Sequence, residues 1–283
     1  MISFRGVNYR IIDSHCHIYP RKIAHKAVES IDRFYDGVPT SCLYDGTPET
    51  LLKIGKTEGI SHFIVHSVAT RPAQVQSINE FIADSVRRAG GAFTGLGTMH
   101  PDSTDPKGDL DHLCELGLKG IKLHPDFQQF HADAARAFRI YELAMERELP
   151  LLVHTGDFRF DYSNPNRVAK VLKAFPELKF IGAHLGGWSM WDDALKLLPQ
   201  YPNMMVDSSS SLFYLKPERA REIIRAFGAE RVMFGTDYPM WHWHTELEAM
   251  EKLQLTDEEY QCIFWKNCAT LYDIPVSETC GLE

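Results

Sequence analysis

The sequence predicts a single-domain α/β protein, a (β/α)8 (TIM) barrel that spans residues 1–283. Short apolar segments alternate with amphipathic stretches along the whole chain, and this alternation is typical of parallel strands joined by crossover helices. The length fits a barrel of about 250 residues with short additions. A doubly wound open sheet would favour a glycine-rich phosphate loop, but neither G-x-G-x-x-G nor G-x-x-x-x-G-K-[ST] occurs in the sequence.

Eight segments are rich in Ile, Val, Leu and Phe and are bounded by Gly, Pro or polar residues, as strands buried on both faces are. The predicted strands cover 9–17, 61–67, 93–99, 120–124, 150–154, 179–184, 204–207 and 231–235. Helical patterns lie between them, and several begin with a proline, as in Asn164-Pro165. The predicted helices cover 48–56, 74–88, 109–116, 132–148, 165–175, 190–198 and 217–227.

Two further segments lie outside this repeat. Residues 31–47 form the longest irregular stretch, and a loop of this length in a compact domain is often a lid over a binding site. Residues 256–265 and 267–272 have helical patterns, so we expect 256–283 to supply C-terminal helices packed on the barrel.

Composition limits the partners that we expect. Hydrophobic residues make up 44% of the chain and charged residues 24%, which fits a large core, and the formal net charge is −8. Nucleic acids and anionic membranes normally require a basic face, so neither is expected as a partner. The chain start lacks the order of a signal peptide, no segment is apolar for about 18 residues, and no C-x-x-C pair occurs. We therefore expect a cytoplasmic protein that acts on a small molecule.

Ionisable residues stand at the C-terminal ends of five predicted strands. That end of the barrel is where enzymes of this fold build their active sites. Residues far apart in the sequence would therefore converge at one mouth. The residues are His15 and His17 on the first strand, Lys122 and His124 on the fourth, His154 on the fifth, His184 on the sixth and Asp237 after the eighth.

Four of these residues form a candidate metal site. His15 and His17 are two apart on a strand, so their side chains face the same side. His154 and Asp237 complete a set of three nitrogens and one oxygen, which suits one divalent metal with an open coordination position. Zn²⁺ is expected first, and Mn²⁺, Fe²⁺, Co²⁺ or Ni²⁺ could also bind.

The same set predicts catalytic roles. A bound metal would lower the pKa of its water toward about 7, and Asp237 could take the proton from that water as a general base. His184 could hold the substrate oxygen or carry a proton. Alternatively, Asp237 could cap a helix, and a single histidine at a strand end could be structural; the combination of four strands favours the catalytic interpretation.

Five motifs in this order resemble the amidohydrolase superfamily, and within it the amidohydrolase-related (amidohydrolase 2) group that includes aminocarboxymuconate-semialdehyde decarboxylase and the resorcylate decarboxylases. The resemblance covers nearly the whole chain and implies the same ligand set, with a homodimer as an expected assembly. Some branches of the superfamily carboxylate a strand-four lysine to bridge two metals, so Lys122 could support a second metal or instead bind a substrate anion. The motifs are IDSHCH at 12–17, GIKLHP at 120–125, LVHTG at 152–156, GAHLGG at 182–187 and FGTDYP at 234–239.

The resemblance is less specific for the reaction. We expect a metal-dependent hydrolase that uses a metal-activated water on a small organic, carboxylate-bearing substrate. The alternative is a metal-dependent non-oxidative decarboxylase of an aromatic or muconate-type acid, and a non-enzymatic metal-binding barrel is a third hypothesis. A small acid with a ring would suit the predicted lining, because arginine pairs with carboxylates and tryptophan covers flat apolar surface. The residues expected to contact substrate are Lys122, His124, Arg159, Trp188 and Trp241.

Overall fold

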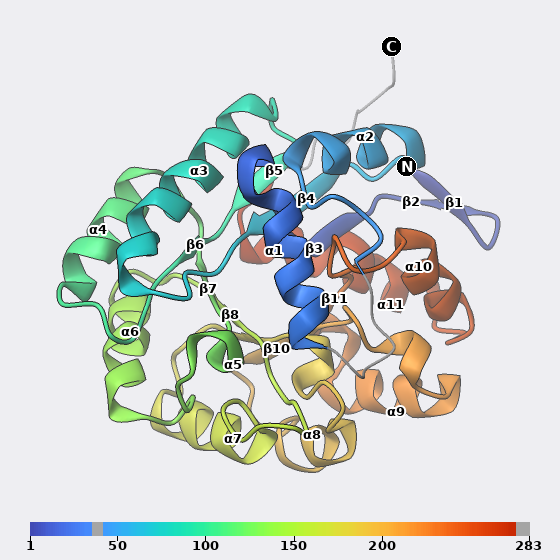
Figure 1. Cartoon of the computed structure of the whole chain (residues 1–283). Coiled ribbons are helices and arrows are strands. Elements are labelled where there is room, and N and C mark those ends of the chain that lie inside the picture. Colours follow the sequence, from blue (N-terminus) through green and yellow to red (C-terminus); the bar gives the residue numbers. More distant parts are fainter. Residues whose placement is uncertain (36–41, 276–283) are drawn as a thin grey trace.

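The computed structural model describes residues 1–35 and 42–275, which fold into one barrel with helices around it (Figure 1). All neighbouring barrel strands pair in parallel. The predicted third strand is divided at Leu96, whose amide still donates to the Val65 carbonyl at 2.9 Å. The strands are β3 (Ile12–His17), β4 (His62–His66), β5 (Phe93–Gly95) with β6 (Gly97–Thr98), β7 (Ile121–Leu123), β8 (Leu151–Val153), β9 (Phe180–Gly182), β10 (Met204–Asp207) and β11 (Val232–Met233).

Backbone hydrogen bonds between the first strand, β3, and the residues that follow the last strand, β11, close the barrel. The Ser14 amide donates to the Phe234 carbonyl at 2.9 Å, and the His17 amide donates to the Tyr238 carbonyl at 2.7 Å. The predicted (β/α)8 barrel is therefore confirmed, and β3 lies beside the segment that follows β11.

The first predicted strand, 9–17, was too long at its start. Tyr9 belongs to an antiparallel hairpin of β1 (Ile2–Phe4) and β2 (Val7–Tyr9), and the barrel strand begins only at Ile12. Arg5 and Gly6 adopt the positive φ angles that turn the hairpin, 52° and 79°. The Tyr9 ring packs edge-on against Phe264. This aromatic contact with the C-terminal segment explains why Tyr9 does not continue the strand.

Helices cover the outside of the barrel, and several begin where a side chain caps the first turn. The Thr47 hydroxyl accepts a hydrogen bond from the Thr50 amide at 3.3 Å, and the Asp105 carboxylate accepts one from the Gly108 amide at 2.9 Å. These helices are α2 (Pro48–Glu58), α3 (Val75–Arg88), α4 (Pro106–Glu115), α5 (Pro125–Gln128), α6 (Ala135–Glu146), α7 (Pro165–Ala174), α8 (Trp191–Leu197), α9 (Pro217–Phe227) and, after the last strand, α10 (Trp243–Glu251).

Three helices, α1 (Arg21–Phe34), α5 and α10, were not predicted, and α1 lies across the end of the barrel in Figure 1. The irregular stretch expected at 31–47 is wrong at its start, because 31–34 form the last turn of this helix. The apolar residues Ile23, Ala27, Ile31 and Phe34 recur at helical spacing, a signal that the many charged residues around them obscured. Residues 36–41 of the expected lid lie outside the described residues.

The C-terminal segment forms one unbroken helical run and not two helices. It consists of α11 (Asp257–Gln261), the π-helical turn η5 (Cys262–Lys266) and α12 (Asn267–Leu271). Residues 276–283 of the expected tail lie outside the described residues. Within 1–35 and 42–275, no helix has both the length and the apolar character needed to cross a membrane.

The barrel interior is apolar at one end and polar at the other. Ile64 and Leu152 belong to a buried cluster that also contains Cys268 of α12. His66 lies two residues after Ile64, and His154 lies two residues after Leu152. The side chains of both histidines therefore also face the barrel interior. The C-terminal helix therefore contributes to the apolar part of the interior, and the histidines gather at the opposite mouth.

Candidate active site

Three predicted ligand atoms form a nearly regular triangle at this mouth. Nε2 of His15 lies 3.3 Å from Nε2 of His17. Oδ1 of Asp237 lies 3.4 Å from the former nitrogen and 3.5 Å from the latter. Ligands at 2.0–2.2 Å around a tetrahedral ion stand about 3.4 Å from one another. The donor set and its spacing therefore fit a divalent metal.

Burial keeps these imidazoles neutral. It lowers the pKa of His15 well below its ordinary value and that of His17 to about 3, and the nearby Lys122 charge acts in the same direction. A neutral imidazole has a free nitrogen lone pair, which is the form that binds a metal. The electrostatics of the site therefore agree with its geometry.

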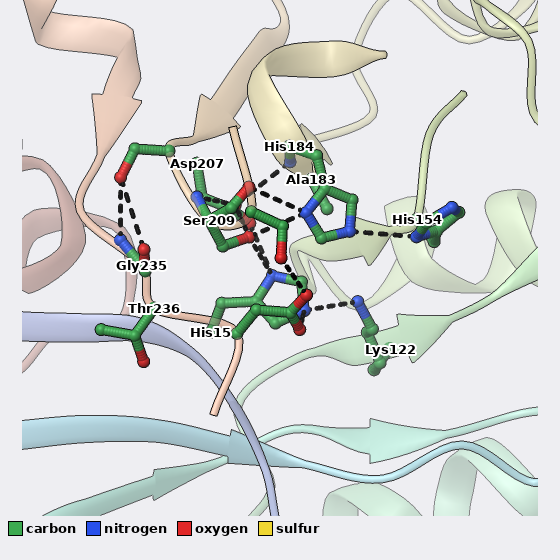
Figure 2. A network of polar contacts seen from close by, with 12 residues as sticks. His15, Lys122, His154, Ala183, His184, Asp207, Ser209, Gly235 and Thr236 are labelled. Atoms are coloured by element: carbon green, nitrogen blue, oxygen red, sulfur yellow. Dashed lines mark hydrogen bonds and ion pairs between the residues drawn. The ribbon is translucent and has the colours of Figure 1, made fainter. Parts of the chain in front are cut away.

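A buried carboxylate that sequence reasoning missed orients His15. Oδ2 of Asp207 accepts a hydrogen bond from Nδ1 of His15 at 2.9 Å, as Figure 2 shows, and Oδ1 accepts one from the His184 amide at 3.2 Å. This contact places the His15 proton on Nδ1 and leaves Nε2 free toward His17 and Asp237. Asp207 ends the predicted strand 204–207, so its position at the mouth was a usable signal.

His154 is not part of the triangle in this structure. Its Nδ1 lies 3.0 Å from Nε2 of His184, and its Nε2 lies 2.9 Å from the Gly156 carbonyl oxygen. The Ser209 hydroxyl lies 3.0 Å from Nδ1 of His184. His154 therefore contacts His184 through its ring nitrogen, and both histidines line a small space that Asp237 also lines. The role of His154 as a ligand stays a prediction.

Lys122 places a side-chain amine, which can carry a positive charge, inside the site. Its side chain is fully buried on β7, and its Nζ lies 3.2 Å from Nε2 of His15 (Figure 2). Burial lowers the pKa of Lys122 to about 8, although the charges of Asp207 and Asp237 act in the opposite direction. The amine is positioned to contact an anion beside the three donor atoms.

His124 has a structural contact as well as a place at the mouth. Its ring stacks on His154 at a centroid distance of 3.9 Å and on Phe127 at 3.8 Å. Its Nδ1 accepts a hydrogen bond from the Phe127 amide at 3.3 Å, so it caps α5. Asp126, which sequence reasoning did not single out, places Oδ2 3.7 Å from Nε2 of His154, and burial raises its pKa to about 7.

His66 at the end of β4 is a further buried histidine of the site. Its ring centroid lies 4.4 Å from that of His17 and 4.8 Å from that of His15. Among the described residues, neither of its ring nitrogens has a hydrogen-bond partner. The sequence offered one signal for this residue, its position at the end of the second strand.

Arg159 is committed to contacts within the protein. Its Nε and Nη2 donate to the two oxygens of buried Asp157 at 2.9 and 2.6 Å, and its Nη1 donates to the Phe34 carbonyl at 2.7 Å. The guanidinium also lies over the rings of Tyr35 and Trp188. Because Asp157 already occupies one edge of the guanidinium, the expected pairing of Arg159 with a substrate carboxylate finds no support in the geometry.

Trp241 contacts the site through a serine. Its Nε1 donates to Oγ of Ser210 at 2.8 Å, and that hydroxyl donates to Oδ2 of Asp237 at 2.6 Å. Trp188 lines the same space as Trp241 and packs edge-on against Tyr35. This arrangement fixes the Asp237 carboxylate, and substrate contact by either tryptophan stays a prediction.

Two of the predicted catalytic residues have a left-handed backbone. The φ angles are 60° at His184 and 61° at Asp237. Such angles in residues other than glycine cost about 1–3 kcal/mol and persist where surrounding contacts enforce them. The hydrogen bonds from the His184 amide to Asp207 and from Ser210 to Asp237 are such contacts.

A comparison of sequences found one curated relative. The chain is 28% identical to the γ-resorcylate decarboxylase of Polaromonas sp. (strain JS666) over 116 residues. That match spans 35% of this chain and about a third, 36%, of the relative.

Solved structures share the fold over nearly the full length. An uncharacterised TIM-barrel protein from Bordetella bronchiseptica is 19% identical, with a TM-score of 0.78 over 93% of this chain and 98% of that one. A dihydroxybenzoic acid decarboxylase from Polaromonas sp. JS666, with bound manganese and 2-nitroresorcinol, is 15% identical, with a TM-score of 0.71 over 96% and 99%. The family model described as Amidohydrolase matches residues 12–274. The chain therefore belongs to the amidohydrolase family.

Proposed function

We propose that the protein is a metal-dependent decarboxylase that removes CO₂ from a small organic acid, the reaction that the sequence placed second. The observation that carries this choice is the sequence match to the γ-resorcylate decarboxylase, because the donor set suits hydrolysis and decarboxylation alike. The manganese-containing dihydroxybenzoic acid decarboxylase of the same fold supports the same choice.

His15, His17 and Asp237 would hold one divalent ion, with His154 as a predicted fourth ligand. The ion would supply positive charge that stabilises negative charge developing on the substrate. Zn²⁺ stays the first prediction from the ligand types, and the manganese in the related structure makes Mn²⁺ the leading alternative.

Lys122 binds the anionic end of the substrate in this proposal. Its Nζ, 3.2 Å from Nε2 of His15, is the basic group beside the donor atoms, and the surrounding protein excludes water. An ammonium group in a buried site interacts strongly with a carboxylate or phenolate. The contact would hold the carbon that carries the carboxylate near Asp237.

Asp237 delivers the proton that replaces CO₂. The bond between the substrate carbon and its carboxylate breaks, CO₂ leaves, and the electron pair that remains on the carbon takes a proton. The Ser210 hydroxyl holds one oxygen of Asp237 at 2.6 Å, so the carboxyl keeps one orientation. His184 borders the same space as Asp237, and in this proposal it returns a proton to that carboxylate.

The reaction is tested with a product assay. Protein loaded with Zn²⁺ or Mn²⁺ is incubated with dihydroxybenzoic acids, muconate-type acids, lactones and amides, while CO₂ and newly released acid or ammonia are measured. Decarboxylation predicts CO₂ and the substrate with hydrogen in place of its carboxylate in equal amounts, and the loss of both products in Asp237→Asn. Hydrolysis, which the sequence placed first, uses the same residues and stays a prediction; acid or ammonia release with no CO₂ would establish it in place of our proposal.

A further inference from the structure

We infer that a cleft between α1 and α3 binds a bulky, uncharged apolar part of the substrate, so that the substrate is a monocarboxylic acid with a large apolar substituent. The position of the acid end rests on the proposed function. The cleft itself is lined by described residues and can be probed without turnover.

The space immediately around the predicted catalytic groups is too small for an organic acid. Beside His184, Asp237 and Trp241 it measures about 10 Å³, and the adjoining space beside His17 and His124 measures about 20 Å³. One water molecule needs about 10–15 Å³. Any larger part of a substrate must therefore extend away from these residues.

The cleft between α1 and α3 provides that room. Its volume is about 570 Å³, within the range of about 300–1,000 Å³ typical of small-molecule sites. His17, Ile31 and Phe127 line both the cleft and the small space beside the donor atoms. The cleft therefore adjoins the metal-binding end, and the inference places the acidic group of a molecule seated in the cleft on that side.

Apolar side chains from both helices face the cleft. On α1 they are Ile23, Ala27, Ile31 and Phe34, the stripe that also identifies this segment as a helix. The opposite wall includes Ile78 and Phe81 of α3. Ile23 is 47% exposed although it is a large apolar residue, and a ligand in the cleft would cover such surface.

The charges along the cleft exclude a second acidic group on the substrate. Among the described residues that line the cleft, Lys26 is the only lysine or arginine, and its side chain is exposed. Asp126 also lines the cleft and is buried. Away from exposed Lys26, a second carboxylate would leave water for apolar walls without a paired cation, which is unfavourable. Neutral polar groups such as Ser30 and Gln74 suit an uncharged substituent with hydroxyl or ether oxygens.

Binding of two probes tests the inference on the full-length, metal-loaded protein. The probes are benzoate and 4-hexylbenzoate, and their dissociation constants are measured by isothermal titration calorimetry. We expect 4-hexylbenzoate to bind at least tenfold more tightly. Ala27→Trp should fill the cleft and reduce this ratio to about twofold or less, and Ile78→Trp should do the same from the opposite wall. Lys22→Trp, an exposed substitution on α1 outside the cleft, should keep the ratio.

The outcomes separate the inference from the proposed function. Equal affinities for the two probes, no binding of 4-hexylbenzoate, or equal effects of Ala27→Trp and Lys22→Trp would overturn the inference. Circular dichroism and thermal melting identify a variant that fails to fold, and the second wall variant then decides. A tenfold preference without CO₂ release from any acid would overturn the proposed function and leave the cleft assignment in place.

Discussion

Nδ1 of His15 donates a hydrogen bond to Oδ2 of Asp207 at 2.9 Å, which links the first strand of the barrel to the seventh. Both side chains are fully buried. The contact selects the His15 tautomer whose Nε2 faces His17 and Asp237. The proposed metal site therefore depends on a residue that is not itself a ligand.

Replacing Asp207 should weaken metal binding. In Asp207→Asn the amide cannot stabilise the His15 proton as a carboxylate does, and we expect about 10–100-fold lower metal affinity. Competition with a fluorescent chelator measures it. Asp193→Asn, an exposed acid on α8, is the control that should keep the original affinity. Unchanged affinity in Asp207→Asn would show that this carboxylate does not position the ligand.

Replacing Asp237 should lower turnover much more than it lowers the amount of bound metal. Asp237→Asn removes the proton carrier, and we expect turnover to fall by about 10²–10⁴-fold while much of the metal stays bound. Steady-state kinetics and elemental analysis of the same preparation check this result. Activity within a few fold of the original would remove Asp237 from the mechanism.

Buried Lys122 should make the stability of the metal-free protein depend on alkaline pH. Its pKa is lowered to about 8 in the fold, whereas an unfolded lysine titrates near 10.4. Between these pH values the unfolded state binds more protons than the folded state. The free energy of unfolding should therefore rise by about 3 kcal/mol as the pH increases from about 8 to about 10.4. Urea unfolding with a chelator present measures this slope. Lys122→Met should flatten it, and a slope that survives in this variant would contradict the assignment.

Arg159 should matter for stability more than for substrate binding. Arg159→Met leaves the Asp157 carboxylate buried without its cation, and we expect a loss of about 3 kcal/mol in the free energy of unfolding. The double variant with Asp157→Asn should recover part of that loss. Normal stability combined with a large increase in KM would instead support the substrate-binding role predicted from the sequence.

The sequence predicted the parts of the site that follow from strand position. His15 and His17 share a face because they are two residues apart, and Asp237 reaches the same mouth because it follows the last strand. His154 shows the limit of this reasoning, since a strand end places a side chain at the mouth but does not determine which neighbour its ring nitrogens meet.

Other features depend on tertiary contacts that no local pattern specifies. Asp207 ends a predicted strand and His66 is the last residue but one of another, but their roles rest on rings contributed by β3. The Arg159–Asp157 pair lies within one loop, so its two-residue spacing could have suggested that the guanidinium is already occupied. Helix α1 carries an apolar stripe, but its polar surroundings made the end of that segment resemble a loop.

The central claim is that His15, His17 and Asp237 hold one divalent cation at the barrel mouth. The most direct measurement is a crystal structure of protein purified with its metal, with anomalous diffraction data collected at the absorption edge of the element found by elemental analysis. We expect one anomalous peak per chain within about 2.0–2.2 Å of the three donor atoms. Full metal content with the peak elsewhere, or with these side chains turned away from it, would rule out this ligand set.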